Sequence, residues 1–144
     1  MFRQVKHYKL PIPDLIKIYV GYIRPVLEYC APVFNGGLTL EQIQNLERIQ
    51  KRVCRIILGK NYVNYDDALI RCQLDKLQTR REKLCIEFAL SLTENPHCKE
   101  WLPIRKDVGM SLRNKHKYSQ YKCKTKRFKQ SAIPYFIDLI NNCS

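Results

Sequence analysis

The sequence of 144 residues has few acids, few glycines and no long apolar run. It contains 13 Asp+Glu against 26 Lys+Arg, with only five glycines, three histidines and one tryptophan. Lys17, Arg24 and Glu28 interrupt the most apolar stretch, which is therefore shorter than the roughly 18 residues of a membrane span. The scattered glycines form no phosphate-binding loop, which excludes the common nucleotide-binding motifs.

The seven cysteines lack the spacing of a zinc site or a disulfide framework. Consecutive cysteines stand at least 13 residues apart and form no C-x-x-C pair. The alternative is a zinc site, which would need His97, Cys98, His116 and Cys123 to converge in space. The first ten residues lack the apolar run of a secretory signal. We therefore expect an intracellular location, free thiols, and no metal or other cofactor.

Apolar residues recur at helical spacing and no convincing alternating strand pattern is present, so we predict a mostly α-helical fold. The first helix follows Asp14 and ends before the Asn35-Gly36-Gly37 turn, with Val26 and Cys30 on its buried face. Pro25 removes one hydrogen bond and predicts a kink near 21–24. Cys30, Cys54 and Cys85 fall on or beside apolar faces, and we expect them to be buried.

The second helix has the clearest boundaries. Thr39 and Gln42 form a capping box at its start, and Gly59 marks its end. Its apolar positions fall within an arc of about 140°. These positions are Ile43, Leu46, Ile49, Val53, Ile56 and Ile57.

Two further helices are predicted over 66–74 and 77–93, followed by a last apolar turn or two over 135–140. We expect Trp101 and Leu102 to seal the edge of the core. The whole chain is then a helical domain of about four helices (1–103), an extended and flexible basic arm (104–130) and a short C-terminal helix (131–144).

The positive charge is concentrated in the arm, which holds ten Lys/Arg and one acid. Cations neutralise phosphates and aromatic rings stack on unpaired bases, so the arm predicts non-specific binding of RNA or DNA. A solvated tail and an anionic membrane surface are the alternatives. The expected backbone contacts are Arg113, Lys115, Lys117, Lys122, Lys124, Lys126 and Arg127, with Tyr118, Tyr121 and Phe128 as stacking residues.

A second, weaker group of cations lies opposite the apolar arc of the second helix. These residues are Arg48, Lys51, Arg52 and Arg55. The alternative is that they complement the helix macrodipole, which favours cations in the last turns.

The tetrapeptide at 64–67 superficially resembles the Tyr-x-Asp-Asp motif of reverse transcriptases, whose carboxylates hold two magnesium ions. That motif has its aromatic residue two positions before the first Asp, where this chain has Asn64. We therefore interpret Asp66 and Asp67 as acids in the first turn of a helix that Asn64 or Tyr65 opens, and assign no catalytic residue.

Four phrases resemble the region C-terminal to the polymerase core in reverse transcriptases of non-LTR (LINE, Jockey-like) retrotransposons. They are LPIPDLIKIY (10–19), YIRPVLEY (22–29), APVF (31–34) and LERIQKRVCRIILG (46–59). The resemblance covers about residues 3–141 and implies a helical thumb-like and post-thumb segment that helps to grip template and primer. The catalytic carboxylates of that family would precede Met1, so we expect a catalytically inert C-terminal fragment.

Two alternative functions stay open. One is the C-terminal part of an active RNA-directed DNA polymerase whose catalytic region is encoded upstream. The other is a protein-interaction module that uses the stripe at 43–57 as a seam for a partner helix. We expect a monomer without a small-molecule substrate, and the Lys/Arg clusters fit either a nuclear signal or phosphate contacts.

Overall fold

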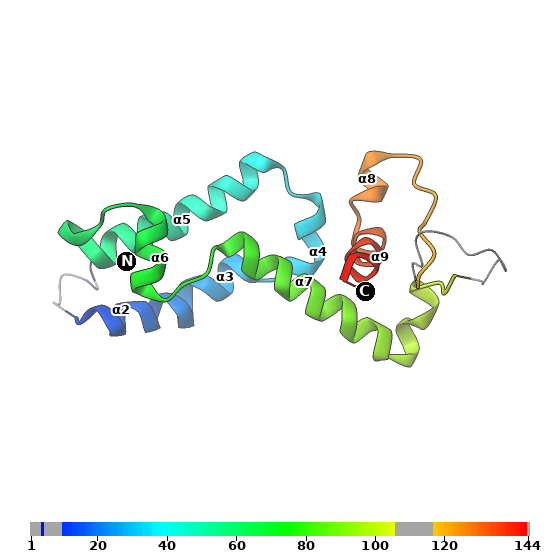
Figure 1. Ribbon diagram of the computed structural model, residues 1–144, viewed down its shortest axis with the longest axis horizontal. Coiled ribbons are helices and arrows are strands. Elements are labelled where there is room, and N and C mark those ends of the chain that lie inside the picture. Colours follow the sequence, from blue (N-terminus) through cyan, green and yellow to red (C-terminus); the bar gives the residue numbers. More distant parts are fainter. Residues whose placement is uncertain (1–3, 5–9, 106–116, 144) are drawn as a thin grey trace. The chain divides into compact units, whose positions relative to one another are not determined.

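The computed structural model describes residue 4 and residues 10–105 and 117–143 (Figure 1). These residues are mostly α-helical, which confirms the predicted fold class. The chain forms two compact units, each built from two separate stretches of sequence. Unit 1 comprises 1–29 and 39–80, and unit 2 comprises 30–38 and 81–144. The domain boundaries predicted at 103 and 130 stay predictions.

Unit 1 is built from helices of the N-terminal half. They are α2 (Ile12–Ile18), a π-helix (Tyr19–Ile23), α3 (Arg24–Glu28), α5 (Leu40–Leu58), α6 (Tyr65–Cys72) and the first turn of α7 (Leu77–Glu94). At the place of the kink predicted near 21–24 the helix changes to the π-helix, which ends two residues before Pro25, a residue with no N–H for an α-helical hydrogen bond.

The first helical stretch differs from the prediction in two ways. Val26 is 74% exposed, because the π-helix adds a residue to the turn and rotates the following residues away from the predicted face. Cys30 has a φ of 52° and separates α3 from α4 (Ala31–Phe34), which leaves its side chain exposed. The prediction that these two side chains are buried is therefore wrong.

Helix α5 has the predicted boundaries. The Thr39 hydroxyl accepts from the Gln42 N–H at 3.3 Å, and the Gln42 side chain accepts from the Thr39 N–H at 2.9 Å. At the other end Gly59 has a φ of 57°, in the left-handed region that favours glycine. The buried face of α5 packs in one cluster with Leu15, Tyr19, Ala68, Leu69, Cys72 and Leu74.

A polar network crosses this cluster and fixes Tyr65 of α6. The Tyr19 hydroxyl donates to Gln50 Oε1 at 2.5 Å, and Gln50 Nε2 donates to the Tyr65 hydroxyl at 2.9 Å and to the Asp75 carbonyl at 2.8 Å. Gln50 is fully buried. Because each polar group of its side chain has a partner, burying it carries little desolvation penalty.

Glu47 links this network to the start of α7. Its carboxylate accepts a hydrogen bond from the Tyr65 hydroxyl. It also accepts from the backbone N–H groups of Leu77 and Gln78, both at 3.3 Å. These N–H groups lie in the first turn of α7, where they have no acceptor within the helix. The Glu47 side chain of α5 therefore positions both α6 and the start of α7.

Unit 2 is built around α7 and α9. It contains α4, a 3₁₀-turn (Asn35–Gly37), most of α7, a 3₁₀-helix (Pro96–Trp101), α8 (Lys126–Lys129) and α9 (Ala132–Cys143). Helix α9 is longer than the predicted turn at 135–140, and α8 lies where we predict an extended arm. The core of unit 2 contains Ala89, Leu92, Cys98, Leu102, Tyr118, Phe136, Ile137 and Ile140.

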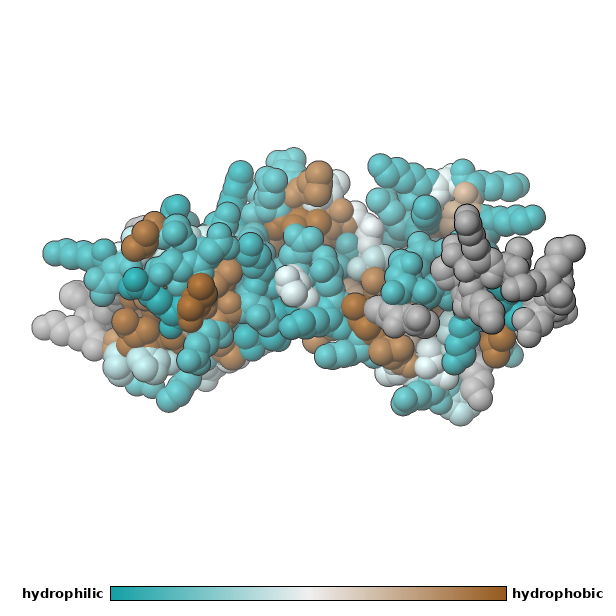
Figure 2. Space-filling view, in the orientation of Figure 1, coloured by the Kyte–Doolittle hydropathy of each residue, from teal (hydrophilic) through white to brown (hydrophobic). Residues whose placement is uncertain are grey.

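Within the described residues no helix is both long and apolar enough to cross a membrane. Figure 2 shows hydrophilic residues over most of the visible surface, with hydrophobic residues in separate patches. One exposed hydrophobic residue is Trp101, which is 52% exposed, whereas Leu102 is buried. The prediction that Trp101 seals the core is therefore wrong.

Candidate nucleic-acid interface

The four cations predicted on α5 share one face of that helix. Their spacing of i, i+3, i+4 and i+7 places them along a single stripe. Within the described residues, this stripe and Ile56 line a surface depression of about 510 Å³ in unit 1. The stripe, called the α5 basic face below, consists of Arg48, Lys51, Arg52 and Arg55.

Two cations of the α5 basic face lie over tyrosine rings. The Lys51 ammonium is 5.0 Å from the centroid of Tyr65, and the Arg55 guanidinium carbon is 5.3 Å from the centroid of Tyr62. The Glu47 and Gln50 hydrogen bonds hold the Tyr65 ring in place. Attraction to the rings restricts both cations without neutralising their charge.

The cations of the α5 basic face form no ion pair within the described part of the chain. The four carboxylates that do form ion pairs in unit 1 bind other cations. The pairs are Asp14 with Lys17, Glu28 with Arg24 and Arg80, Asp66 with Lys76, and Asp67 with Arg71. The macrodipole alternative fits Arg55, the basic residue of the last turn, better than Arg48, which lies in the middle of α5.

The cations predicted in the arm belong to unit 2. Arg113 and Lys115 lie outside the described residues. The other five have exposed side chains, and the ammonium of Lys117 lies 5.6 Å from the ring centroid of Tyr118. These five are Lys117, Lys122, Lys124, Lys126 and Arg127.

Tyr118 is part of the core and not a stacking residue. It is 6% exposed, and its N–H and carbonyl bond to the side chain of Asn141 at 3.2 and 3.1 Å. An antiparallel bridge to Ile104 adds to this anchor. The stacking role predicted for Tyr118 is therefore wrong, because its ring is covered by core residues of unit 2.

The other two predicted stacking residues are partly exposed and contact each other. Tyr121 is 39% exposed and Phe128 46%. Their rings meet edge to face, with centroids 6.4 Å apart and planes at 78°. Both rings therefore keep exposed surface beside the cations of the arm.

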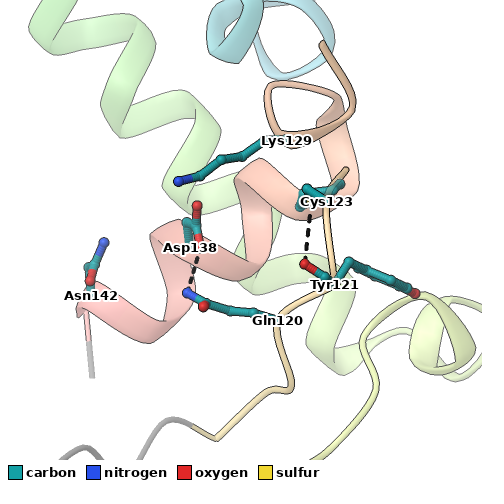
Figure 3. A pocket seen from close by; sticks show the side chains of 7 residues that line it. Gln120, Tyr121, Cys123, Lys129, Asp138 and Asn142 are labelled. Atoms are coloured by element: carbon teal, nitrogen blue, oxygen red, sulfur yellow. Dashed lines mark hydrogen bonds between the residues drawn. The ribbon is translucent and has the colours of Figure 1, made fainter. Parts of the chain in front are cut away.

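A polar depression of about 430 Å³ in unit 2 has Tyr121 among its lining residues (Figure 3). Gln120 donates to Asp138 at 2.8 Å, and the Cys123 thiol donates to the Tyr121 carbonyl at 3.4 Å. Its other lining residues are Lys129, Pro134 and Asn142. The depression combines a cation with a carboxylate, so it does not favour an anion in the way that the α5 basic face does.

Buried thiols and phenols in unit 1 are held in their neutral forms. Burial raises the pKa of Cys54 to about 12, with a smaller contribution from the neighbouring thiol of Cys72. Burial also raises the pKa of Tyr19 and of Tyr65, and for Tyr65 the bond to Glu47 adds to the effect. A protonated thiol is a poor nucleophile, so Cys54 has a structural role in the core.

The remaining groups singled out in the sequence have structural positions. Asp66 and Asp67 lie in the first turn of α6, and Asn64 caps that helix by accepting from the Asp67 N–H at 2.8 Å. This confirms their interpretation as acids at a helix start. Among the described side chains, no group of three or more His, Cys, Asp or Glu is placed to hold a metal ion, and His116 lies outside them.

Comparison of the chain with protein-family models, with curated proteins and with solved structures finds no match. The resemblance to reverse transcriptases therefore stays a prediction from the quoted phrases. The site is interpreted from its own geometry. Sequence reasoning missed Tyr62 and Tyr65 as parts of it, since they follow α5 in the chain and helical spacing along α5 gives no signal for them.

Proposed function

We propose that this protein binds the sugar-phosphate backbone of RNA or DNA without reading its sequence and without a catalytic step of its own. The observation that carries the proposal is the α5 basic face. Its four cations form one stripe, two of them lie over tyrosine rings, and within the described residues none is paired with an acid. Such cations release counterions from a phosphate backbone, which provides most of the free energy of non-specific binding.

We also propose that the chain corresponds to the thumb and post-thumb region of a non-LTR reverse transcriptase. The support is the four sequence phrases, and a mostly helical fold is compatible with them. The proposed role is then to bind a template–primer inside the cell, while the polymerase core of such enzymes catalyses the reaction. The interaction-module alternative is less favoured, because Val53 and Ile57 of its seam are buried in unit 1.

The double variant Arg48→Ala/Arg52→Ala tests the proposed function. These side chains do not lie over a tyrosine ring, so their removal should leave the fold intact. We expect weaker binding of a fluorescent primer–template hybrid. The slope of log affinity against log salt should become shallower by about 1.5, the sum for two phosphate contacts.

The matched control is Lys17→Ala/Lys76→Ala, which removes the same charge. These lysines already bind Asp14 at 3.2 Å and Asp66 at 3.1 Å, so we expect little change in affinity or slope. Equal effects of the two double variants would contradict the proposal, because net charge alone would then explain binding. Circular dichroism checks that both variants stay helical.

A further inference from the structure

Three aromatic residues of unit 2 are partly exposed and are linked by contacts of Tyr121 with the Phe128 ring and with the Trp101 backbone. Trp101 ends the 3₁₀-helix Pro96–Trp101, Tyr121 lies in the segment before α8, and Phe128 lies in α8. The Tyr121 hydroxyl donates to the Trp101 carbonyl at 3.3 Å, and the Tyr121 ring packs edge to face on Phe128. Tyr121 therefore joins the three residues into one group, called the aromatic cluster below.

The aromatic cluster is not part of the hydrophobic core. The core of unit 2 has its own aromatic residues, Tyr118 and Phe136, which are 6% and 2% exposed. The side chain of Thr125 accepts from the Phe128 N–H at 3.2 Å and fixes the start of α8. The Tyr121 ring is therefore held at its hydroxyl and against Phe128, which reduces the conformational entropy lost when a flat ligand stacks on it.

The cluster lies in a segment rich in exposed cations. Residues 117–130 contain six Lys/Arg and no acid. Glu100 precedes Trp101 in the sequence, and Asp138 of α9 is bonded to Gln120. Lys122, Lys124, Lys126 and Arg127 are all exposed. A surface that combines exposed aromatic rings with cations suits a polyanion whose units carry flat faces.

We propose that the aromatic cluster binds single-stranded RNA or DNA by stacking on unpaired bases. The inference rests on the proposed function for its phosphate contacts and adds the class of nucleic acid that unit 2 prefers. In a duplex the base faces are stacked on one another, so only single strands offer them to Trp101, Tyr121 and Phe128. The α5 basic face does not offer its aromatic rings to bases in the same way, because its cations lie over Tyr62 and Tyr65.

The fluorescence of Trp101 reports stacking directly, because this residue is the only tryptophan of the chain. The full chain is titrated with a single-stranded oligonucleotide, with an abasic strand of the same number of phosphates, and with a duplex of the same length. We expect the base-bearing strand to quench Trp101 and to bind about tenfold more tightly than the abasic strand. The abasic strand and the duplex should bind with little quenching.

Two single variants separate stacking from general loss of an aromatic residue. Trp101→Leu should weaken binding of a labelled single strand about tenfold and leave duplex binding unchanged. Tyr22→Leu is the matched control, since Tyr22 is 72% exposed in unit 1, and we expect no effect. Thermal unfolding of both variants checks that they keep the fold.

The outcomes distinguish the inference from the proposed function. Equal affinity and equal quenching for base-bearing and abasic strands would overturn the stacking inference but leave backbone binding standing. Equal effects of Trp101→Leu and Tyr22→Leu would overturn it as well. Absence of saturable binding of all three probes at low salt would overturn both proposals.

Discussion

At the residue scale, position along a helix predicts burial better than it predicts partners. Gln50 falls inside the apolar arc of α5, so helical spacing alone places it near the core. Its partners could not be predicted, because Tyr19 and Tyr65 are 31 and 15 positions away in the sequence. For the same reason the sequence predicts Tyr65 only as part of a helix start and gives no signal for its ring beneath Lys51.

For Tyr118 the sequence predicts the wrong exposure, because its charged neighbours indicate an exposed aromatic residue. Local composition places it in a basic arm, whereas its backbone pairs with Asn141 of α9, 23 positions later. A buried ring inside a basic segment gives no periodic signal when only a few residues around it are apolar. Tyr121 and Phe128, in the same segment, do keep exposed rings.

Cys54 gives a prediction about pH. Its pKa is raised from the ordinary value of 9.0 to about 12, so the unfolded chain releases this proton at lower pH than the folded chain. The contribution of this thiol to the free energy of unfolding should therefore be fully present below pH 9. It should be lost as the pH rises towards 12, by at most about 1.4 kcal/mol per pH unit. Urea unfolding at several pH values between about 8.5 and 9.5, below the ordinary pKa values of tyrosine and lysine at about 10 and 10.4, measures it.

The variant Cys54→Ala separates this effect from other titrations. It removes the buried thiol, so its unfolding free energy should fall less steeply with pH than that of the parent chain. Cys30→Ala, which removes an exposed thiol, is the control and should keep the steeper dependence. Parallel curves for the parent and Cys54→Ala would contradict the prediction.

At the scale of elements, helices with local end signals could be predicted and breaks in register could not. Thr39, Gln42 and Gly59 define α5 through contacts within a few residues, and Asn64 does the same for α6. Pro25 predicts an irregularity near 21–24 but not the extra residue of the π-helix at 19–23, and the positive φ of Cys30 has no local signal. An apolar pattern read at constant period therefore continues through them and assigns Val26 to the wrong face.

The short turn at 35–37 gives a prediction about unit 2. A Cβ atom at Gly36 would lie 2.7 Å from Cγ of Tyr135 and 3.1 Å from the carbonyl oxygen of Gln130. Gly36→Ala should therefore destabilise the protein by about 1–3 kcal/mol, as overpacking does. Gly37→Ala is a close control, because a Cβ there meets no atom within 4 Å.

Thermal or urea unfolding of the two alanine variants measures the difference. Gly37→Ala should leave the midpoint unchanged or raise it slightly, since alanine restricts the unfolded chain. The Asn35 side chain, which donates to the Tyr135 hydroxyl at 3.0 Å, should lose this bond in Gly36→Ala alone. Equal midpoints for the two variants would mean that the Tyr135 ring does not pack against this turn.

At the scale of the whole molecule, the sequence order of segments does not give the compact units. Residues 30–38 join unit 2 through contacts such as Asn35 with Tyr135, which are 100 positions apart. Local periodicity contains no information at that range, although it predicts the mostly helical class. The α5 basic face could be predicted, because it depends, like the helix itself, only on the spacing of residues within α5.

Because residues 104–130 belong to the compact unit 2, the proposed function is better tested by point substitutions than by deletion of this segment. Deletion of 104–130 would remove Tyr118 from the core of unit 2 together with the cations of the arm. A loss of binding after that deletion would not separate charge from folding. Point substitutions at exposed cations avoid this problem, because their side chains lie outside both hydrophobic clusters.

The most direct test of backbone binding is the salt dependence of the full chain. Its affinity for a labelled primer–template hybrid is measured at several salt concentrations, and log affinity is plotted against log salt. We predict a straight line with a slope of about −3 or steeper, since the α5 basic face alone offers four phosphate contacts. A slope near zero, or no saturable binding at low salt, would contradict the account.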